Sequence, residues 1–215
     1  MVNMNGQKAG WRPEEKERKT VKRAFFVLLV HLVATLFLCM PVQAEEDLPR
    51  VRMQTSLGEI ELELFADKAP RTVKNFLNYV NKQFYDGLIF HRVISGWIIQ
   101  GGGYDENLDY FATDPPVRNE ASKHKLENVR GTIAMARGFD PNSADTQFFI
   151  NLSDNPSFNF KNRTSKGYGY SVFGRVTYGM DVADAIGEKP TGAKGHLEKD
   201  VPLKTIFIEK IEVID

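Results

Sequence analysis

Short strand-like stretches separated by turn residues constrain the fold of this chain more than any other feature. In residues 59–64 (EIELEL) acidic and apolar residues alternate strictly, and Val51, Met53 and Thr55 alternate just before them. A period of two is typical of a strand with one buried and one solvated face. Because residues 56–58 (SLG) favour a turn, the sequence predicts a β-hairpin here.

Helical periodicity is confined to two segments. After Pro70, which suits a first helical position, apolar residues recur at Val73, Phe76, Leu77 and Val80. A shorter amphipathic pattern follows and stops at a glycine, a common helix end, which places it at residues 180–187.

Six further apolar segments are short and bounded by Gly, Pro, Asn or Asp. None is followed by a helix long enough for the crossover that parallel strands require. We therefore predict a mainly β fold, an antiparallel barrel or sandwich with two helices. The six segments are residues 90–94, 97–100, 132–136, 147–150, 172–176 and 205–214.

The N-terminal segment has the order of a secretory signal. A basic stretch at residues 16–23 precedes an apolar run at 24–40, and a small residue, Ala44, closes the segment. We predict cleavage after Ala44. Two alternatives stay open: an uncleaved membrane anchor formed by residues 24–40, and lipid attachment at Cys39, which the bulky residues before it disfavour. The predicted organisation is a signal at 1–44, a polar N-terminus at 45–49 and one domain at 50–215.

Charge and cysteine content narrow the function classes. The chain has 28 basic and 28 acidic residues, and the first 44 positions hold seven of the basic and three of the acidic ones, which leaves a net charge of −4 for the remainder. We therefore expect no nucleic-acid partner, since binding phosphates requires a basic surface. Cys39 is the only cysteine, so the predicted domain has no thiol, disulfide or cysteine-based metal site.

The sequence does not contain several common catalytic motifs at the required spacing. Residues 100–103 (QGGG) lack the spacing of a phosphate-binding loop and are interpreted as a tight turn or bulge. His91, His124 and His196 are far apart and lack metal-ligand spacing. No G-x-S-x-G motif frames a nucleophile. We expect neither covalent catalysis nor a cofactor or metal.

Polar residues embedded in aromatic and aliphatic strands carry a resemblance to the cyclophilins. In order along the chain, several blocks resemble the signature blocks of that family, and the resemblance extends from about residue 51 to residue 214. The blocks are residues 68–70 (KAP), 75–76 (NF), 90–94 (FHRVI), 100–102 (QGG), 131–136 (GTIAMA), 147–150 (QFFI), 172–176 (VFGRV) and 179–181 (GMD). Residues 119–121 (NEA) and 179–184 (GMDVAD) most resemble the secreted bacterial members.

The resemblance implies a fold and an activity. The family fold is a closed eight-stranded antiparallel barrel capped by two α-helices, and the activity is cis/trans isomerisation of X-Pro peptide bonds. Arg92 is the implied catalytic residue, with Gln100, Gln147 and backbone groups around Ala136 and Arg137 holding the flanking peptide. The complete set implied to bind substrate is Phe90, Trp97, Ile98, Gln100, Ala136, Arg137, Gln147, Phe149, Phe158 and Tyr170.

Four positions depart from the usual family pattern. Trp97 stands where Phe is usual, and Phe158, Asn159 and Tyr170 stand where many eukaryotic members have Trp, Leu and His. The alignment is gapped between residues 155 and 169, so Phe160 is an alternative to Phe158 as a wall of the proline pocket.

The expected partners are proline-containing peptides and unfolded or partly folded exported proteins, with the chain a monomer in the periplasm. Membrane association is expected only through residues 24–40, if these are not removed. An alternative function is a peptide-binding holdase that uses the same groove with little turnover. The presence of Arg92 argues against it, because binding alone does not require a transition-state donor.

Overall fold

Alternating burial builds the first hairpin of the structure. The computed structural model describes residues 48–111 and 113–214. In β1 (Arg50–Thr55) and β2 (Gly58–Leu64) every second residue is buried and faces the core. On the outer face, the Arg50 and Arg52 guanidinium groups form ion pairs with the Glu61 carboxylate at 2.8 and 3.0 Å. The predicted hairpin is confirmed.

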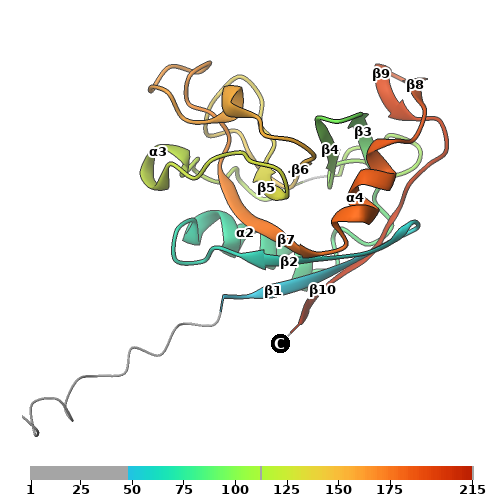
Figure 1. The fold of residues 1–215 in the computed structure, drawn as a ribbon, viewed down its shortest axis with the longest axis horizontal. Helices are drawn as coiled ribbons and strands as arrows, with labels where there is room; N and C mark the ends of the chain where they lie inside the picture. The colour runs from blue at the N-terminus through green and yellow to red at the C-terminus, as the bar shows by residue number, and fades with distance from the viewer. Residues whose placement is uncertain (1–47, 112, 215) are drawn as a thin grey trace, which may run out of the picture. The chain divides into compact units, whose positions relative to one another are not determined.

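Eight strands form one antiparallel sheet in the order β10-β1-β2-β7-β5-β6-β4-β3 (Figure 1). The chain segments before β3 and β10 meet in an isolated bridge between Ile89 and Phe207, not in a ladder. The expected eight-stranded antiparallel fold is confirmed, but as a strongly curled half-barrel and not a fully closed barrel. The remaining strands of this sheet are β3 (Phe90–Ile94), β4 (Ile98–Gly101), β5 (Thr132–Met135), β6 (Phe148–Asn151), β7 (Val172–Tyr178) and β10 (Ile208–Ile214).

Two helices pack against the core of this half-barrel, as predicted. α2 (Pro70–Asn81) begins with its proline and buries Phe76, whose ring lies 5.2 to 5.8 Å from those of Tyr85, Phe148 and Phe173. α4 (Met180–Gly187) adds Ala183 and Ile186 to the same cluster. The contacts join both helices to the sheet through one continuous apolar core.

Four short elements were not predicted. They are α3 (Ala121–His124), the 3₁₀ turn η1 (Pro156–Phe158), and the strands β8 (Thr191–Lys194) and β9 (Leu197–Pro202). β8 and β9 form a separate two-stranded sheet, and β9 packs beside β3. The hairpin of β8 and β9 lies beyond α4 at one end of the curled sheet (Figure 1).

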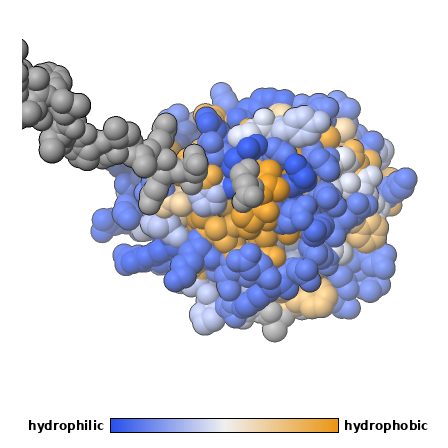
Figure 2. All heavy atoms as spheres, turned by 90° about the horizontal axis from the view of Figure 1, so that it is seen from below, coloured by the Kyte–Doolittle hydropathy of each residue, from blue (hydrophilic) through white to orange (hydrophobic). Residues whose placement is uncertain are grey.

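The face that carries β1 and β10 is mostly hydrophilic, with an apolar area near its centre (Figure 2). In the part of the chain that the structure describes, no helix is long and apolar enough to span a bilayer. The predicted signal segment, its cleavage position and Cys39 lie outside the described residues.

Candidate functional site

The outer face of β6 carries the apolar part of the site. Phe148 and Ile150 point into the main core, whereas Phe149 between them belongs to a second apolar cluster with Ala134 and Val172. Successive residues of a strand face opposite sides, so this sheet is buried on both faces at β6. The outer cluster is covered by the loop between β6 and β7.

Strand register places polar side chains beside this cluster. Arg92 of β3 pairs with Gln100 of β4, Gln100 pairs with Phe149 of β6, and Phe149 pairs with Ala134 of β5. Directly opposed residues share a face of the sheet. A single row across four strands therefore runs from a cation through an amide to an aromatic ring and a methyl group.

A β-bulge at the start of β3 gives Arg92 its direction. The register shifts between Phe90 and Arg92, since these two residues oppose the adjacent residues Gly101 and Gln100. Without the bulge, Phe90 and Arg92 would share a face. Instead Phe90 is fully buried in the main core, 6.5 Å from the Phe148 ring, so the structure does not bring it to the predicted site.

A chain of buried asparagines fixes the loop that covers the site. The Asn155 amide donates to the Asn151 Oδ1 at 2.7 Å, and the Asn151 amide donates to the Thr132 Oγ1 at 2.9 Å. The Asn155 backbone amide also donates to the Asn128 carbonyl at 2.7 Å. Buried amides are costly to leave unpaired, so this network holds the loop, and with it Phe158, over the outer face.

Phe158 forms one wall of an aromatic cluster. Its ring centroid lies 5.1 Å from Trp97, 5.5 Å from Phe149 and 4.9 Å from Tyr170. Phe160 instead packs against Tyr168 at 5.5 Å. Of the two alternatives left open by the sequence, Phe158 is therefore the one that faces the outer cluster.

These side chains line a cavity of about 190 Å³ whose walls combine three aromatic rings and two aliphatic side chains with two guanidinium groups and an amide. Trp97 does not line it but packs behind Phe158. The lining consists entirely of predicted site residues: Arg92, Ile98, Gln100, Ala136, Arg137, Phe149, Phe158 and Tyr170.

Two neighbours hold the Arg92 guanidinium at the edge of this cavity. Its Nη1 donates to the Gln100 Oε1 at 3.4 Å, and its Nε lies 3.6 Å from the Asp200 carboxylate on β9. Gln100 is itself oriented, because its amide donates to the Gln147 Oε1 at 2.9 Å. Asp200 was not predicted, since no strand pattern in the sequence indicated β9.

Arg137 ties the loops around the cavity together. Its guanidinium donates to the carbonyls of Gly169, Ser165 and Gly138 at 2.9, 2.8 and 2.9 Å, and it stacks 4.9 Å from the Tyr170 ring. The Ala136 amide donates to the Gln147 carbonyl at 2.9 Å. The Arg137 side chain therefore has a structural role that its predicted backbone role did not include.

A second hollow of about 270 Å³ shares Gln100, Ala136 and Arg137 with the first, and Gln147 lines it. On its wall the Tyr110 hydroxyl donates to the Asp145 carboxylate. Burial and this bond raise the pKa of Tyr110 to about 12. The tyrosine therefore stays protonated at neutral pH, and the two hollows together form an extended groove.

Burial lowers the pKa of His91 to about 4, so this imidazole is neutral at neutral pH. Within residues 48–111 and 113–214, no group of three or more His, Cys, Asp or Glu side chains is arranged to hold a metal ion. Gly102 has a φ of +83°, and a Cβ there would lie 2.9 Å from the Phe148 ring. Gln100 and Gly101 belong to β4, so the predicted turn is confined to Gly102 and Gly103, where the chain bends and Gly102 has a backbone conformation that favours glycine.

Comparison with known proteins relates the chain to one family. The family described as "Cyclophilin type peptidyl-prolyl cis-trans isomerase/CLD" matches residues 50–213. Peptidyl-prolyl cis-trans isomerase B of Escherichia coli (strain K12) is 48% identical over 163 residues, which cover 76% of this chain and 98% of that protein. Peptidyl-prolyl cis-trans isomerase A of Dickeya dadantii (strain 3937) is 45% identical over 193 residues, covering 90% and 98%.

A solved structure agrees with these matches. A cyclophilin type peptidyl-prolyl cis-trans isomerase of Cryptosporidium parvum, crystallised in the presence of the dipeptide Ala-Pro, superposes with a TM-score of 0.62. It is 28% identical, and the match covers 77% of this chain and 99% of that chain.

Proposed function

From the premise that this chain belongs to the cyclophilin family of peptidyl-prolyl cis-trans isomerases, we propose that Arg92 is its catalytic residue and that its substrates are exported proteins. The isomerase activity itself follows from the family match and from the identity with named isomerases. The single observation that carries the catalytic assignment is that Arg92 lines the same cavity of about 190 Å³ as the apolar side chains of Ile98, Phe149 and Phe158.

Amide resonance opposes rotation about a peptide bond with a barrier of about 18–20 kcal/mol. The prolyl nitrogen gains a lone pair as the bond twists, and a guanidinium N–H can then donate to it. This hydrogen bond is available in the twisted transition state and largely absent in the planar ground state, so it lowers the barrier. No covalent intermediate and no proton transfer is needed.

Each group around the cavity has a distinct part in this proposal. The apolar walls formed by Phe149, Phe158 and Ile98 receive the proline ring. The Arg92 Nη1 donates to Gln100, and its Nε faces the Asp200 carboxylate in an ion pair. Within the described residues no partner is found for its Nη2. This nitrogen is therefore the donor we assign to the prolyl nitrogen.

The first experiment compares Arg92→Ala with the unaltered protein in the isomerisation of a proline-containing test peptide. We expect kcat/KM to fall by about two to three orders of magnitude, equivalent to about 3–4 kcal/mol of transition-state stabilisation. Arg92→Lys should recover only part of the loss, because an ammonium lacks the planar arrangement of donors. Arg175→Ala, which removes an exposed strand arginine paired with Glu63 at 2.9 Å, serves as the matched control.

Peptide affinity, measured separately by calorimetry, distinguishes catalysis from binding. A transition-state role predicts that Arg92→Ala changes affinity by less than about fivefold while turnover collapses. If the folded variant keeps its turnover, the catalytic assignment is wrong. If the unaltered protein binds peptides with little turnover, the groove acts as a holdase.

The export proposal is supported by the basic, apolar and small-residue order of the first 44 residues. The similarity to the Dickeya dadantii protein includes part of this region, because 193 residues exceed the length of segment 50–215. Fractionation of cells that produce the full chain tests the proposal. We expect a soluble periplasmic protein whose N-terminus is Glu45, whereas full-length protein in the membrane fraction would mean that residues 24–40 anchor it.

A further inference from the structure

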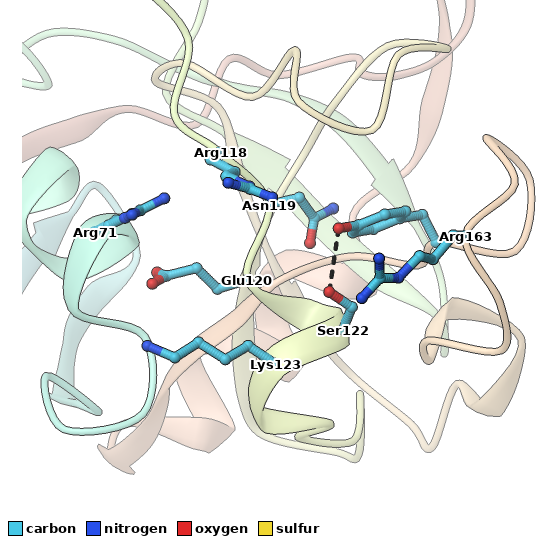
Figure 3. Close-up of a pocket in the computed structure, with 8 residues that line it drawn as sticks. Arg71, Arg118, Asn119, Glu120, Ser122, Lys123 and Arg163 are labelled. Carbon is cyan, nitrogen blue, oxygen red and sulfur yellow. Dashed lines mark hydrogen bonds between the residues drawn. The ribbon is translucent and has the colours of Figure 1, made fainter.

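A pocket of about 360 Å³ lies apart from the substrate groove and shares no lining residue with it. Four cationic side chains from separate parts of the chain surround it. Figure 3 shows Arg71 of α2 and Arg163 on opposite sides, with Arg118 above and Lys123 of α3 below. No sequence pattern indicates this cluster of cations, since the segment after the predicted signal carries a net charge of −4.

The four cationic side chains have no ion-pair partner in the part of the chain that the structure describes. The one carboxylate of the pocket, Glu120, is buried and already accepts from the Thr72 backbone amide and hydroxyl at 2.9 Å each. The pocket thus has a net charge of about +3, and like charges gathered in one hollow repel unless an anion joins them.

Neutral donors supplement the charges. The Ser122 and Tyr168 hydroxyl groups are 3.1 Å apart, and only one of their two hydrogens can lie between them, so the other is free to donate to a ligand (Figure 3). Three of the four cations are arginines, whose planar forks suit bidentate contacts with the oxygens of a phosphate or carboxylate.

We propose that this pocket binds a small multivalent anion of the phosphate type, such as a diphosphate group. The concave shape and the volume of about 360 Å³ suit a compact ligand and not a long polymer. The surplus of about three charges favours a ligand with several negative charges over a single carboxylate. The diphosphate could be a free anion or part of a phosphorylated lipid headgroup.

The pocket is connected to the active site through the loop between β6 and β7. The Gly169 carbonyl accepts from the Asn119 side chain of the pocket at 3.1 Å and from the Arg137 Nε of the groove at 2.9 Å. The same loop carries Arg163 and Tyr168 in the pocket and Tyr170 in the catalytic cavity. A bound anion would therefore restrain the loop that forms one wall of the catalytic cavity.

Calorimetric titration of the full chain with inorganic pyrophosphate, at an ionic strength of about 0.15 M, tests the proposal. We expect saturable binding that Arg118→Gln and Arg163→Gln each weaken by about tenfold or more. Lys166→Gln removes the same charge from the same loop at an exposed position outside the pocket, and should change the affinity by less than about twofold. Isomerase activity without pyrophosphate should be unchanged in all three variants, which verifies that they fold.

A parallel titration with vesicles that contain an anionic phospholipid distinguishes a free diphosphate from a phosphorylated lipid headgroup as the ligand. Pocket-dependent binding of vesicles together with weak binding of pyrophosphate would identify a lipid headgroup as the ligand. The proposal is wrong if neither probe binds, or if Lys166→Gln weakens binding as much as Arg163→Gln does. Selective, pocket-dependent binding of a glutamate-rich peptide would overturn it in favour of an acidic polypeptide partner. Isomerase activity is measured without any anion, so failure of the anion proposal would leave the proposed catalytic function unaffected.

Discussion

At the scale of single residues, the position of the Arg92 guanidinium depends on charges supplied by distant parts of the chain. Asp200 lies on β9, has a left-handed backbone conformation with a φ of +65°, and reaches within 3.6 Å of the Arg92 Nε. Aspartate tolerates this conformation better than most residues do. The contact is partly exposed, with 39% and 22% of the two side chains accessible, so its electrostatic contribution is modest.

We expect Asp200→Asn to lower kcat/KM by about three- to tenfold, because the variant keeps the size of the side chain but loses the charge that orients Arg92. In an Arg92→Ala background the same change should have an effect of less than about twofold. Such non-additivity, measured as a double-mutant cycle, identifies a residue that acts through another. Glu198→Gln, on the same strand, is the control.

Equal losses in both backgrounds would show that Asp200 stabilises the β8–β9 hairpin instead of positioning Arg92.

At the scale of elements, the loop between β6 and β7 decides which aromatic ring lines the cavity. Phe158→Ala removes a wall of the cavity, so we expect kcat/KM to fall by about ten- to hundredfold, mainly through KM, from the loss of roughly 1.5–3 kcal/mol of apolar contact. Phe160→Ala also removes a phenyl ring, but one that packs against Tyr168. Its kcat/KM should therefore stay within about threefold of the value for the unaltered protein.

Steady-state kinetics of the two variants with one peptide provides the measurement. A larger loss in Phe160→Ala than in Phe158→Ala would contradict the assignment of the wall.

The first hairpin and the two packed helices could be predicted because each has a strong period, and the other strands of the large sheet because they are short apolar runs bounded by turn residues. Residues 59–64 alternate strictly, and α2 repeats its apolar residues along one face. The β8–β9 hairpin could not be predicted, because no residue of Thr191–Lys194 is buried and the segment has no apolar alternation. Its ion pair with Arg92, through Asp200, exists only in the tertiary structure.

The structure brings together those predicted site residues that share a face of the sheet, and separates one at an irregular stretch of backbone. Eight of the predicted residues line one cavity. Phe90 does not, because the bulge between Phe90 and Arg92 sends the two side chains to opposite faces. A period of two cannot anticipate a bulge, and the basic pocket likewise joins segments whose proximity no local pattern indicates.

At the scale of the whole molecule, buried histidines couple global stability to pH. His91 is only 4% exposed, and its pKa is lowered to about 4 from an ordinary value of 6.5 chiefly by burial. Burial also lowers the pKa of His124. In both cases the unfolded chain binds the proton more readily than the folded protein does, so acid favours unfolding.

The lowered pKa of His91 defines the pH range over which stability is lost. Stability attributable to His91 is complete above about pH 6.5 and is lost as pH falls towards 4, where the folded state also takes up the proton. Between pH 7 and pH 4.5 this loss amounts to about 2 kcal/mol in the free energy of unfolding. Isomerase activity should stay nearly flat between about pH 6 and 8, because the proposed mechanism transfers no proton.

Urea unfolding of the full chain at the two pH values, compared with His91→Phe, measures this effect. The variant keeps an aromatic ring beside Tyr104, which now lies 4.7 Å from the imidazole, but cannot titrate. Its stability should therefore fall by about 2 kcal/mol less on acidification than that of the unaltered protein, whatever its stability at pH 7. His124 and the carboxylates titrate in both proteins and cancel in the difference. If acidification destabilises His91→Phe and the unaltered protein equally, His91 is already protonated in the folded protein. Its Nδ1 would then have to donate a hydrogen bond, but this atom has no partner among the described residues.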